Sequence, residues 1–328
     1  MHSLASSLGA TSLTCFSTSR QADHHQTGTV IACSMCDFSK YGGKSVEWLH
    51  LEGTLPVPPE MSMEILQRTT NETREAASLK TMETLASQVK VQDYAIPTAD
   101  GDALKARTYK PSSTSNGRVL PIYLHLHGGG FFFGTLDSEN ATCAAIAIDV
   151  EVLVVNVNYR HTPEHPYPVP YDDAEAALEW VYKHADGLGG DQNRVVVGGI
   201  SAGGALTASL AQTLNRGAGK TAILGQVLMI PLVVHEDCSG PLFEQLKDPQ
   251  KSSYHENEFA PILPLTRMRM FNGLLHHKPP NPDDRRLNPG LAGTEELKGL
   301  PPAVFGVCGL DPLRDEALLY AKMLHTAG

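Results

Sequence analysis

The chain has 328 residues, of which 41% are hydrophobic and 19% charged, with a formal net charge of −10. This length and apolar content suit one large α/β domain and exclude a chain that is disordered throughout. The acidic balance, without a run of Lys or Arg, excludes the basic surface typical of nucleic-acid binding. No apolar run reaches the 18 residues of a transmembrane helix.

The N-terminal residues 1–43 show no periodicity and are predicted to form a disordered tail. Residues 1–22 are rich in Ser and Thr, hold one Arg and lack acids, a weak similarity to a transit peptide. They lack the apolar stretch of a secretory signal, so a cytoplasmic location is predicted. Cys33 and Cys36 form an isolated CxxC, for which we predict no metal site. Cys143 and Cys308 lie in apolar surroundings and are predicted to be buried free thiols.

Residues 44–92 are predicted to form a helical cap. Apolar side chains recur there at spacings near three and four, with an interruption at Asn71 and Glu72. The residues that carry this pattern are Met61, Ile65, Leu66, Leu79, Met82, Leu85 and Val89.

Residues 93–328 alternate between strand-like and helix-like segments, which predicts an α/β catalytic domain. The strand candidates are continuous apolar runs, typical of a mostly parallel sheet with helices on both faces. Asp172 or Asp173 is the expected cap of the first helix. Residues 234–302 are rich in proline and are expected to form part of a lid. The predicted strands are 91–97, 103–109, 119–126, 150–157, 194–200, 225–230 and 303–308, and the predicted helices are 172–184, 201–215, 266–275 and 314–325.

The most informative motif is Gly199-Ile200-Ser201-Ala202-Gly203, between a predicted strand and a predicted helix. This is the context of the GxSxG nucleophile elbow, in which a sharp turn exposes the serine hydroxyl. Small neighbours allow the turn, and the helix N-terminus favours developing negative charge. The alternative is an ordinary glycine-rich turn.

A second motif, His127-Gly128-Gly129-Gly130, follows the strand that ends at Leu126. Consecutive glycines leave backbone N–H groups unobstructed, as the oxyanion of an acyl-transfer intermediate requires. A phosphate-binding loop is the alternative, but neither the P-loop lysine nor a GxGxxG spacing is present.

These motifs resemble the hormone-sensitive-lipase family of α/β-hydrolases. The matching stretches are HGGGFFFG (127–134), VNVNYRHTPEHPYPVPYDDAEAALEWV (155–181), RVVVGGISAGG (194–204) and GLPPAVFGVCGLDPLRDEALLYAKMLHTAG (299–328). The resemblance implies a serine carboxylester hydrolase that needs no cofactor or metal and acts on small esters.

The resemblance also implies roles for individual residues. Ser201 is the expected nucleophile, and the N–H groups of Gly129, Gly130 and Ala202 are the expected oxyanion hole. Asp311 is the expected acid that orients the base; its alternative is a turn-forming Asp-Pro. His127 and Gly128 are expected to support the oxyanion loop. Phe131, Phe132 and Phe133 are expected either to line a substrate pocket or to belong to the core.

Two features depart from the family pattern. Ile200 stands where many members carry a polar residue. The family's triad runs Ser, Asp or Glu, then His, and its histidine follows one more strand after the acid. The chain as given ends at Gly328 without such a strand. We therefore expect a C-terminally truncated catalytic domain without its final strand and helix.

Other histidines are weak candidates for the catalytic base. His325, the only histidine after Asp311, is expected at the far end of the last helix. His161 and His165 are expected to support the core, and His276 and His277 to be solvated. The sequence therefore predicts an impaired esterase, because Ser201 is a weak nucleophile without a base. The alternatives are a non-catalytic small-molecule binder of the same fold, as in the plant gibberellin receptors, or a fragment without function.

Overall fold

The computed structural model describes residues 35–54, 61–115, 117–216, 223–275 and 279–328. Its centre is a seven-stranded sheet in the order β1-β2-β4-β3-β5-β6-β7. β1 pairs antiparallel with β2, β2 pairs antiparallel with β4, and all other pairs are parallel. The predicted, mostly parallel sheet is therefore confirmed. The strands are β1 (Val89–Pro97), β2 (Ala103–Pro111), β3 (Leu120–Leu126), β4 (Leu153–Asn158), β5 (Gly190–Ile200), β6 (Gly225–Met229) and β7 (Ala303–Gly306).

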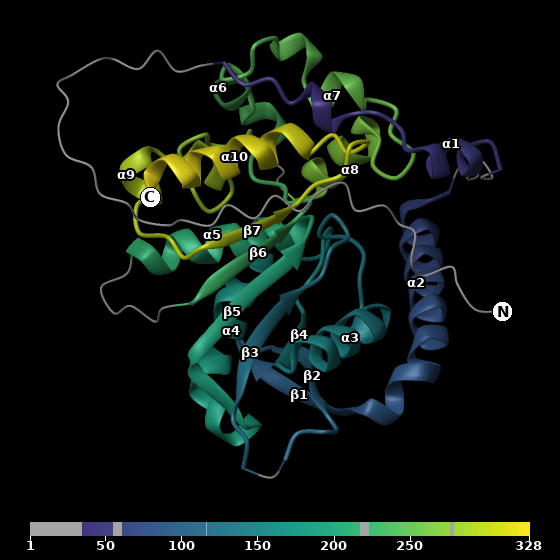
Figure 1. Ribbon diagram of the computed structural model, residues 1–328, viewed down its shortest axis with the longest axis vertical. Helices are drawn as coiled ribbons and strands as arrows, with labels where there is room; N and C mark the ends of the chain where they lie inside the picture. The colour runs from purple at the N-terminus through teal and green to yellow at the C-terminus, as the bar shows by residue number, and fades with distance from the viewer. Residues whose placement is uncertain (1–34, 55–60, 116, 217–222, 276–278) are drawn as a thin grey trace.

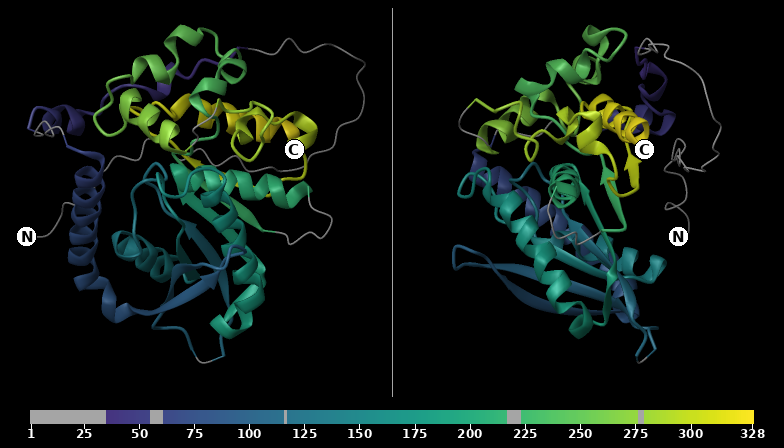
Figure 2. Two further views of the ribbon diagram at one scale, coloured as in Figure 1. Left: turned by 180° about the vertical axis from the view of Figure 1, so that it is seen from behind. Right: turned by 90° about the vertical axis from the view of Figure 1, so that its left-hand side faces the viewer.

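Helices cover both faces of the sheet (Figures 1 and 2). α4 and α5 pack on one face, over β3 and β5, while α3 packs on the other face over β2 and β4. α2 lies outside α3, and the short helices α6, α7 and α8 gather beyond one edge of the sheet (Figure 1). The helices are α1 (Val46–Glu52), α2 (Met63–Leu85), α3 (Asn140–Val150), α4 (Val169–Leu188), α5 (Ala202–Arg216), α6 (Gly240–Phe243), α7 (Ser253–Glu256), α8 (Leu265–Leu275), α9 (Thr294–Leu297) and α10 (Arg314–Ala327).

The main core lies between the sheet and α4 and α5. Leu124, Val155 and Val197 from three adjacent strands are fully buried there, and they pack with Leu178 of α4 and Leu206 of α5. Strand residues of this kind stabilise a two-sided sheet because both of their faces leave water. None of the described helices combines the length and the apolar character that a bilayer span requires.

The structure corrects several local predictions. α3 was not predicted, because its sequence lacks a polar face that would mark helical periodicity. α4 begins at Val169, after Pro168, so neither Asp172 nor Asp173 caps it. Asp173 is instead fully buried and pairs with the Arg160 guanidinium, with 2.7 Å between Oδ1 and Nη2. Cys308 is exposed, whereas Cys143 is buried as predicted.

Part of the predicted N-terminal tail packs against the body of the molecule. The N–H of Cys36 donates to the carbonyl of Gln245 over 2.8 Å, and the Cys36 side chain is buried. Residues 39–41 form a short 3-10 helix. Residues 1–34, which include Cys33, lie outside the described residues, as do His276 and His277.

Candidate active site

Ser201 occupies the sharp turn between β5 and α5. Its φ of 55° lies in the left-handed region, which a residue other than glycine adopts only at a strained position. Glycine is required on both sides. A Cβ at Gly199 would overlap the backbone of Gly203, and a Cβ at Gly203 would overlap the carbonyl oxygen of Leu126. The turn therefore has the geometry expected of a nucleophile elbow.

Backbone hydrogen bonds hold this turn against the next strand. The N–H of Ser201 donates to the carbonyl of Met229 over 2.8 Å, and the Ser201 carbonyl accepts from Ala205 over 3.0 Å. Ile200 pairs with Met229, which pairs with Gly306, so three parallel strands end in one row. Ser201 and the loop after β7 thus share the carboxyl edge of the sheet, about 10 Å apart across two strand spacings.

The glycine loop lies directly beside the elbow, because Leu126 at the end of β3 pairs with Gly199 of β5. Gly129 and Gly130 have φ values of 138° and 63°. A side chain at position 130 would overlap the ring of Phe271, so both conformation and space demand glycine there. Among the hydrogen bonds of the described residues, none uses the N–H of Gly129, Gly130 or Ala202 as donor. The three groups predicted to bind an oxyanion are therefore available.

His127 is fully buried beneath this loop and does not face solvent. Its ring stacks on Tyr159 with 4.3 Å between centroids, and the Tyr159 hydroxyl donates to the His127 carbonyl over 2.8 Å. Burial lowers the pKa of His127 to about 4 and that of His161 to about 3. Both rings are therefore neutral at pH 7, in line with structural rather than acid–base roles.

Ile200 lies against the glycine loop. Its carbonyl oxygen and its Cγ2 would lie 2.8 Å and 3.3 Å from a Cβ at position 128, so Gly128 is required for this contact. The apolar side chain that departs from the family pattern thus packs on the loop next to Ser201.

Asp311 follows β7 and is 8% exposed. One carboxylate oxygen accepts the N–H of Leu313 over 2.9 Å, and the backbone carbonyl accepts from Arg314 over 3.2 Å. Burial raises the pKa of Asp311 to about 6, because this one hydrogen bond and the nearby Arg314 offset only part of the lost hydration. Within the described ranges of the chain, this carboxylate forms no ion pair, and Arg314 acts on it only through its nearby charge.

No histidine of the described residues forms a hydrogen bond with the Ser201 hydroxyl or the Asp311 carboxylate. His325 is in the last turn of α10, about 16 Å along the helix from Arg314 at its start. The structure therefore brings the predicted nucleophile and oxyanion donors together. It places the predicted acid on the same edge, with no described histidine bonded to either side chain.

The three phenylalanines of the loop are buried. Phe131 packs on Tyr171 with 5.8 Å between centroids and belongs to the main core. Phe132 and Phe133 pack with Phe271 of α8, at 6.3 Å and 5.6 Å. We therefore assign Phe131 to the core, and Phe132 and Phe133 to a small aromatic cluster that joins the loop to α8.

One set of residues beside the site was missed by the sequence reasoning. α2 runs unbroken through Asn71, and its inward side carries polar residues at helical spacing. The signal was present in the sequence, since Gln67, Asn71, Arg74 and Ser78 recur at intervals of three and four. The apolar pattern does not reveal this side, because the residues that face the loop are polar.

Comparisons with known sequences point to one family of proteins. A family model described as alpha/beta hydrolase fold matches residues 123–328. Esterase LipI of Mycobacterium tuberculosis is 38% identical over 248 residues, 74% of this chain and 71% of the relative. Carboxylesterase NlhH of the same organism is 36% identical over 251 residues, 76% and 74% respectively. Ethyl acetate hydrolase of Pseudomonas putida is 30% identical, covering 73% of this chain and 70% of the relative.

The fold is also similar to those of solved structures. Vibralactone cyclase superposes with a TM-score of 0.81 at 27% identity, covering 91% of this chain and 87% of that chain. EstE1, a thermostable carboxylesterase from a metagenomic library, gives 0.68 at 33% identity, with coverage of 82% and 84%. The chain belongs to the hormone-sensitive-lipase family of α/β-hydrolases, a family of carboxylic ester hydrolases.

Proposed function

We propose that the protein hydrolyses small carboxylic esters through an acyl-enzyme on Ser201. The observation that carries the proposal is the juxtaposition of Ser201, held at a φ of 55°, with three N–H donors that have no partner among the described residues. Donors fixed before the reaction stabilise the oxyanion without reorganisation, and one such donor contributes about 2.7–4 kcal/mol. The ethyl acetate hydrolase among the relatives supports a short acyl group.

The reaction has two halves. The Ser201 oxygen attacks the acyl carbon while its proton passes to a base, and the carbonyl oxygen becomes an oxyanion held by Gly129, Gly130 and Ala202. Collapse of this intermediate expels the alcohol and leaves the acyl group on Ser201. Water then attacks the same carbon and releases the carboxylic acid. Asp311 is assigned the task of orienting and stabilising a protonated histidine.

We further propose that the 328-residue chain by itself turns over slowly. The supporting observation is that neither the Ser201 hydroxyl nor the Asp311 carboxylate has a histidine partner in the part of the chain that the structure describes. Without a base the serine is a weak nucleophile, and only the contribution of the oxyanion hole and of substrate binding remains.

Imidazole in solution tests both parts of the proposal, because it can act as the base that a histidine side chain supplies in the family's triad. Initial rates of p-nitrophenyl butyrate hydrolysis are measured against imidazole concentration for the wild type and for Ser201→Ala. Rates without protein are subtracted, since imidazole itself cleaves the ester. We expect a slow wild type whose rate rises at least about tenfold with imidazole, and a Ser201→Ala variant that does not respond.

Two results would contradict the proposal. Equal rates and equal responses in both proteins would remove Ser201 from the reaction and favour a folded small-molecule binder. Fast hydrolysis by the wild type without imidazole, lost in Ser201→Ala, would instead support Ser201 and overturn the slow turnover.

A further inference from the structure

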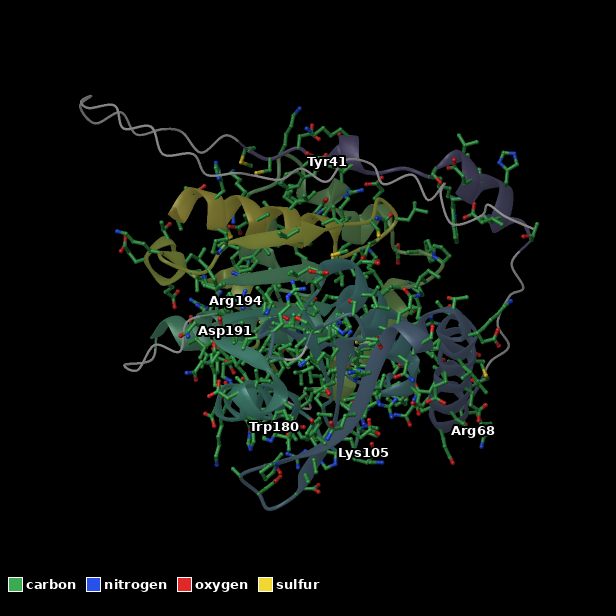
Figure 3. The ribbon with its side chains drawn as sticks, turned by 60° about the horizontal axis from the view of Figure 1, so that its bottom comes forward. Tyr41, Arg68, Lys105, Trp180, Asp191 and Arg194 are labelled. Carbon is green, nitrogen blue, oxygen red and sulfur yellow. The ribbon has the colours of Figure 1, made fainter. Side chains whose placement is uncertain are left out.

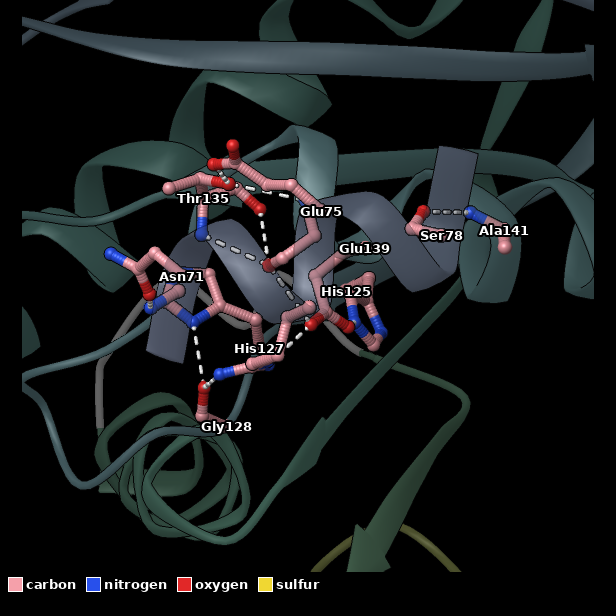
Figure 4. Close-up of polar contacts among 12 residues, drawn as sticks. Asn71, Glu75, Ser78, His125, His127, Gly128, Thr135, Glu139 and Ala141 are labelled. Carbon is pink, nitrogen blue, oxygen red and sulfur yellow. Dashed lines mark hydrogen bonds and ion pairs between the residues drawn. The ribbon is translucent and has the colours of Figure 1, made fainter. Parts of the chain in front are cut away.

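α2 is joined to the oxyanion loop by a row of polar contacts along one side of the helix. Figure 4 shows Asn71, Glu75 and Ser78 turned toward the segment between Gly128 and Ala141. The contacts follow the chain in order, from the glycine loop to the start of α3. They join Gln67 Nε2 to the Phe132 carbonyl at 2.8 Å, Asn71 Oδ1 to the Gly134 N–H at 2.9 Å, Glu75 Oε1 to the Thr135 hydroxyl at 2.6 Å, and Ser78 Oγ to the Ala141 N–H at 3.1 Å.

A fifth contact reaches the glycine motif itself. The Arg74 guanidinium donates to the Gly128 carbonyl over 3.3 Å and to Glu139 over 2.6 Å. Glu139 is 4% exposed, and its second oxygen contacts the ring of His125 on β3 at 3.2 Å. Arg74 is therefore held between the loop and a buried carboxylate, which fixes the direction of its bond to Gly128.

One bonded carbonyl, that of Gly128, belongs to the same peptide unit as the N–H of Gly129, a proposed oxyanion donor. The other, that of Phe132, lies two residues after Gly130. The N–H groups of Gly129 and Gly130 have no partner of their own among the described residues. The direction of the Gly129 N–H thus depends on the bond from Arg74 to its own peptide unit. That of the Gly130 N–H depends on the Gly129 carbonyl, which accepts from the N–H of Phe132, the residue whose carbonyl Gln67 binds. Glycine backbone has wide conformational freedom, so an external restraint has a direct effect there.

We infer that the polar face of α2, defined by Gln67, Asn71, Arg74, Glu75 and Ser78, positions the oxyanion loop. These are positioning residues, since none of them is placed against the reacting atoms. The inference rests on the proposed function. It adds the part of the fold that holds the oxyanion donors in place before the substrate binds. Apolar contacts also hold α2, through Leu66 against the aromatic cluster of Phe132 and Phe133 and through Met82 and Leu85 against α3. The polar contacts lie between these two apolar ends of the helix.

In two of these contacts the side-chain amide has opposite hydrogen-bonding roles, which allows a direct test. Asn71 accepts from a backbone N–H, so its oxygen faces the loop, whereas Gln67 donates to a backbone carbonyl, so its nitrogen faces the loop. Changing either amide to the acid keeps the side-chain shape and adds the same charge. Asn71→Asp keeps its acceptor, while Gln67→Glu loses its donor and sets a carboxylate against a carbonyl oxygen.

The experiment measures backbone hydrogen exchange of peptides covering residues 127–136, together with ester hydrolysis. We expect Gln67→Glu to speed exchange of this segment and lower kcat, each about 3- to 10-fold, the effect of one lost hydrogen bond, with KM unchanged. Asn71→Asp is expected to stay within about twofold of the wild type. Glu72→Gln is the control, because Glu72 lies on the exposed side beside Arg68, which reaches solvent in Figure 3.

Equal behaviour of the two acid variants would overturn the inference, whether both loosen the segment or neither does. If Gln67→Glu does not fold, Gln67→Met removes the donor without adding charge and is expected to give the same faster exchange. Hydrogen exchange is measured without substrate. It therefore tests whether α2 positions the loop even if Ser201→Ala shows that Ser201 takes no part in hydrolysis.

Discussion

At the residue scale, the turn around Ser201 depends on glycines whose side-chain space is already filled. The Cβ of an alanine at position 203 would overlap the backbone carbonyl of Leu126, which belongs to a buried strand and has no free room to move. The elbow and the glycine loop thus touch through backbone atoms. Any side chain between them has to separate the nucleophile from its oxyanion donors.

Gly203→Ala is therefore expected to lower both stability and Ser201-dependent hydrolysis. Overpacking of this kind costs about 1–3 kcal/mol in the free energy of unfolding. Gly187→Ala in α4 is the matched control, since nothing lies within 4 Å of its added Cβ. That change is expected to stabilise the protein by about 0.5–1 kcal/mol. Urea unfolding of both variants checks the prediction, and equal midpoints would contradict it.

Asp311 gives a prediction about pH. Its pKa is raised by burial to about 6 from an ordinary value of 3.8. Between these values the native state binds more protons than the unfolded state, so stability decreases as pH rises from about 4 to 6. Asp311→Asn mimics the protonated form. It is expected to raise the free energy of unfolding by about 2–3 kcal/mol at pH 7.5 and to change it little below pH 4.

The measurement is urea unfolding of wild type and Asp311→Asn at the two pH values. Glu316→Gln serves as a comparison, because the pKa of Glu316 is also raised by burial, to about 8, but Glu316 accepts hydrogen bonds from Tyr254 and the Val233 N–H. If Asp311→Asn raised the free energy of unfolding equally at both pH values, burial would not be what raises the pKa of the Asp311 carboxyl.

At the scale of elements, the glycine loop is held by α2 on one side and by α8 on the other. Phe271 of α8 fills the space that a side chain at Gly130 would need, and its ring meets Phe133 edge-on at 5.6 Å. Phe271 is 9% exposed, whereas Phe259, in the loop before α8, is 86% exposed. Replacing each of these two phenylalanines by alanine therefore compares the loss of a buried ring with the loss of an exposed one.

Phe271→Ala is expected to destabilise the protein by about 3–5 kcal/mol, since it leaves a cavity beside the loop. Phe259→Ala is expected to change stability by less than about 0.5 kcal/mol. Thermal unfolding of both variants is the check. A similar loss in both would mean that Phe271 does not pack against the loop as described.

The elements themselves were largely predictable from the sequence. Continuous apolar runs marked the central strands, whereas β1 and β2 carry charged residues along their length. The two glycine motifs marked the turns beside the proposed site. α3 was missed because Cys143, Ala144 and Ala147 are buried in a helix without a polar face. The inward side of α2 was also misjudged, since Ile65 and Leu79 of the apolar pattern are 41% and 71% exposed. The middle of α2 faces the loop with Asn71 and Arg74, which make polar contacts to it.

At the scale of the whole molecule, the two faces of the sheet are covered unequally. Val227 and Val304 pair on one face of β6 and β7, with Met229 on the same face. Met229 is 40% and Val304 is 43% exposed, while Leu228 on the opposite face is fully buried. Exposed apolar side chains on an edge strand favour self-association.

Val304→Lys is expected to reduce self-association and binding of the dye ANS, with a change in stability below about 0.5 kcal/mol. Light scattering at high protein concentration and ANS fluorescence measure the two effects. Val91→Lys on β1, at the opposite edge, is the control, because Val91 is similarly exposed at 44% but its neighbour on the same face is the charged Asp93. Equal effects of both substitutions would argue against a specific association surface on β7.

The central claim is that Ser201 carries the acyl group. Its most direct test is peptide mass spectrometry of the protein mixed with p-nitrophenyl butyrate and imidazole and then quenched in acid. We predict one butyryl group on the peptide that contains Ser201, and none on that peptide in Ser201→Ala. Hydrolysis that continues in Ser201→Ala at the wild-type rate, or a butyryl group found on another residue instead, would contradict the claim.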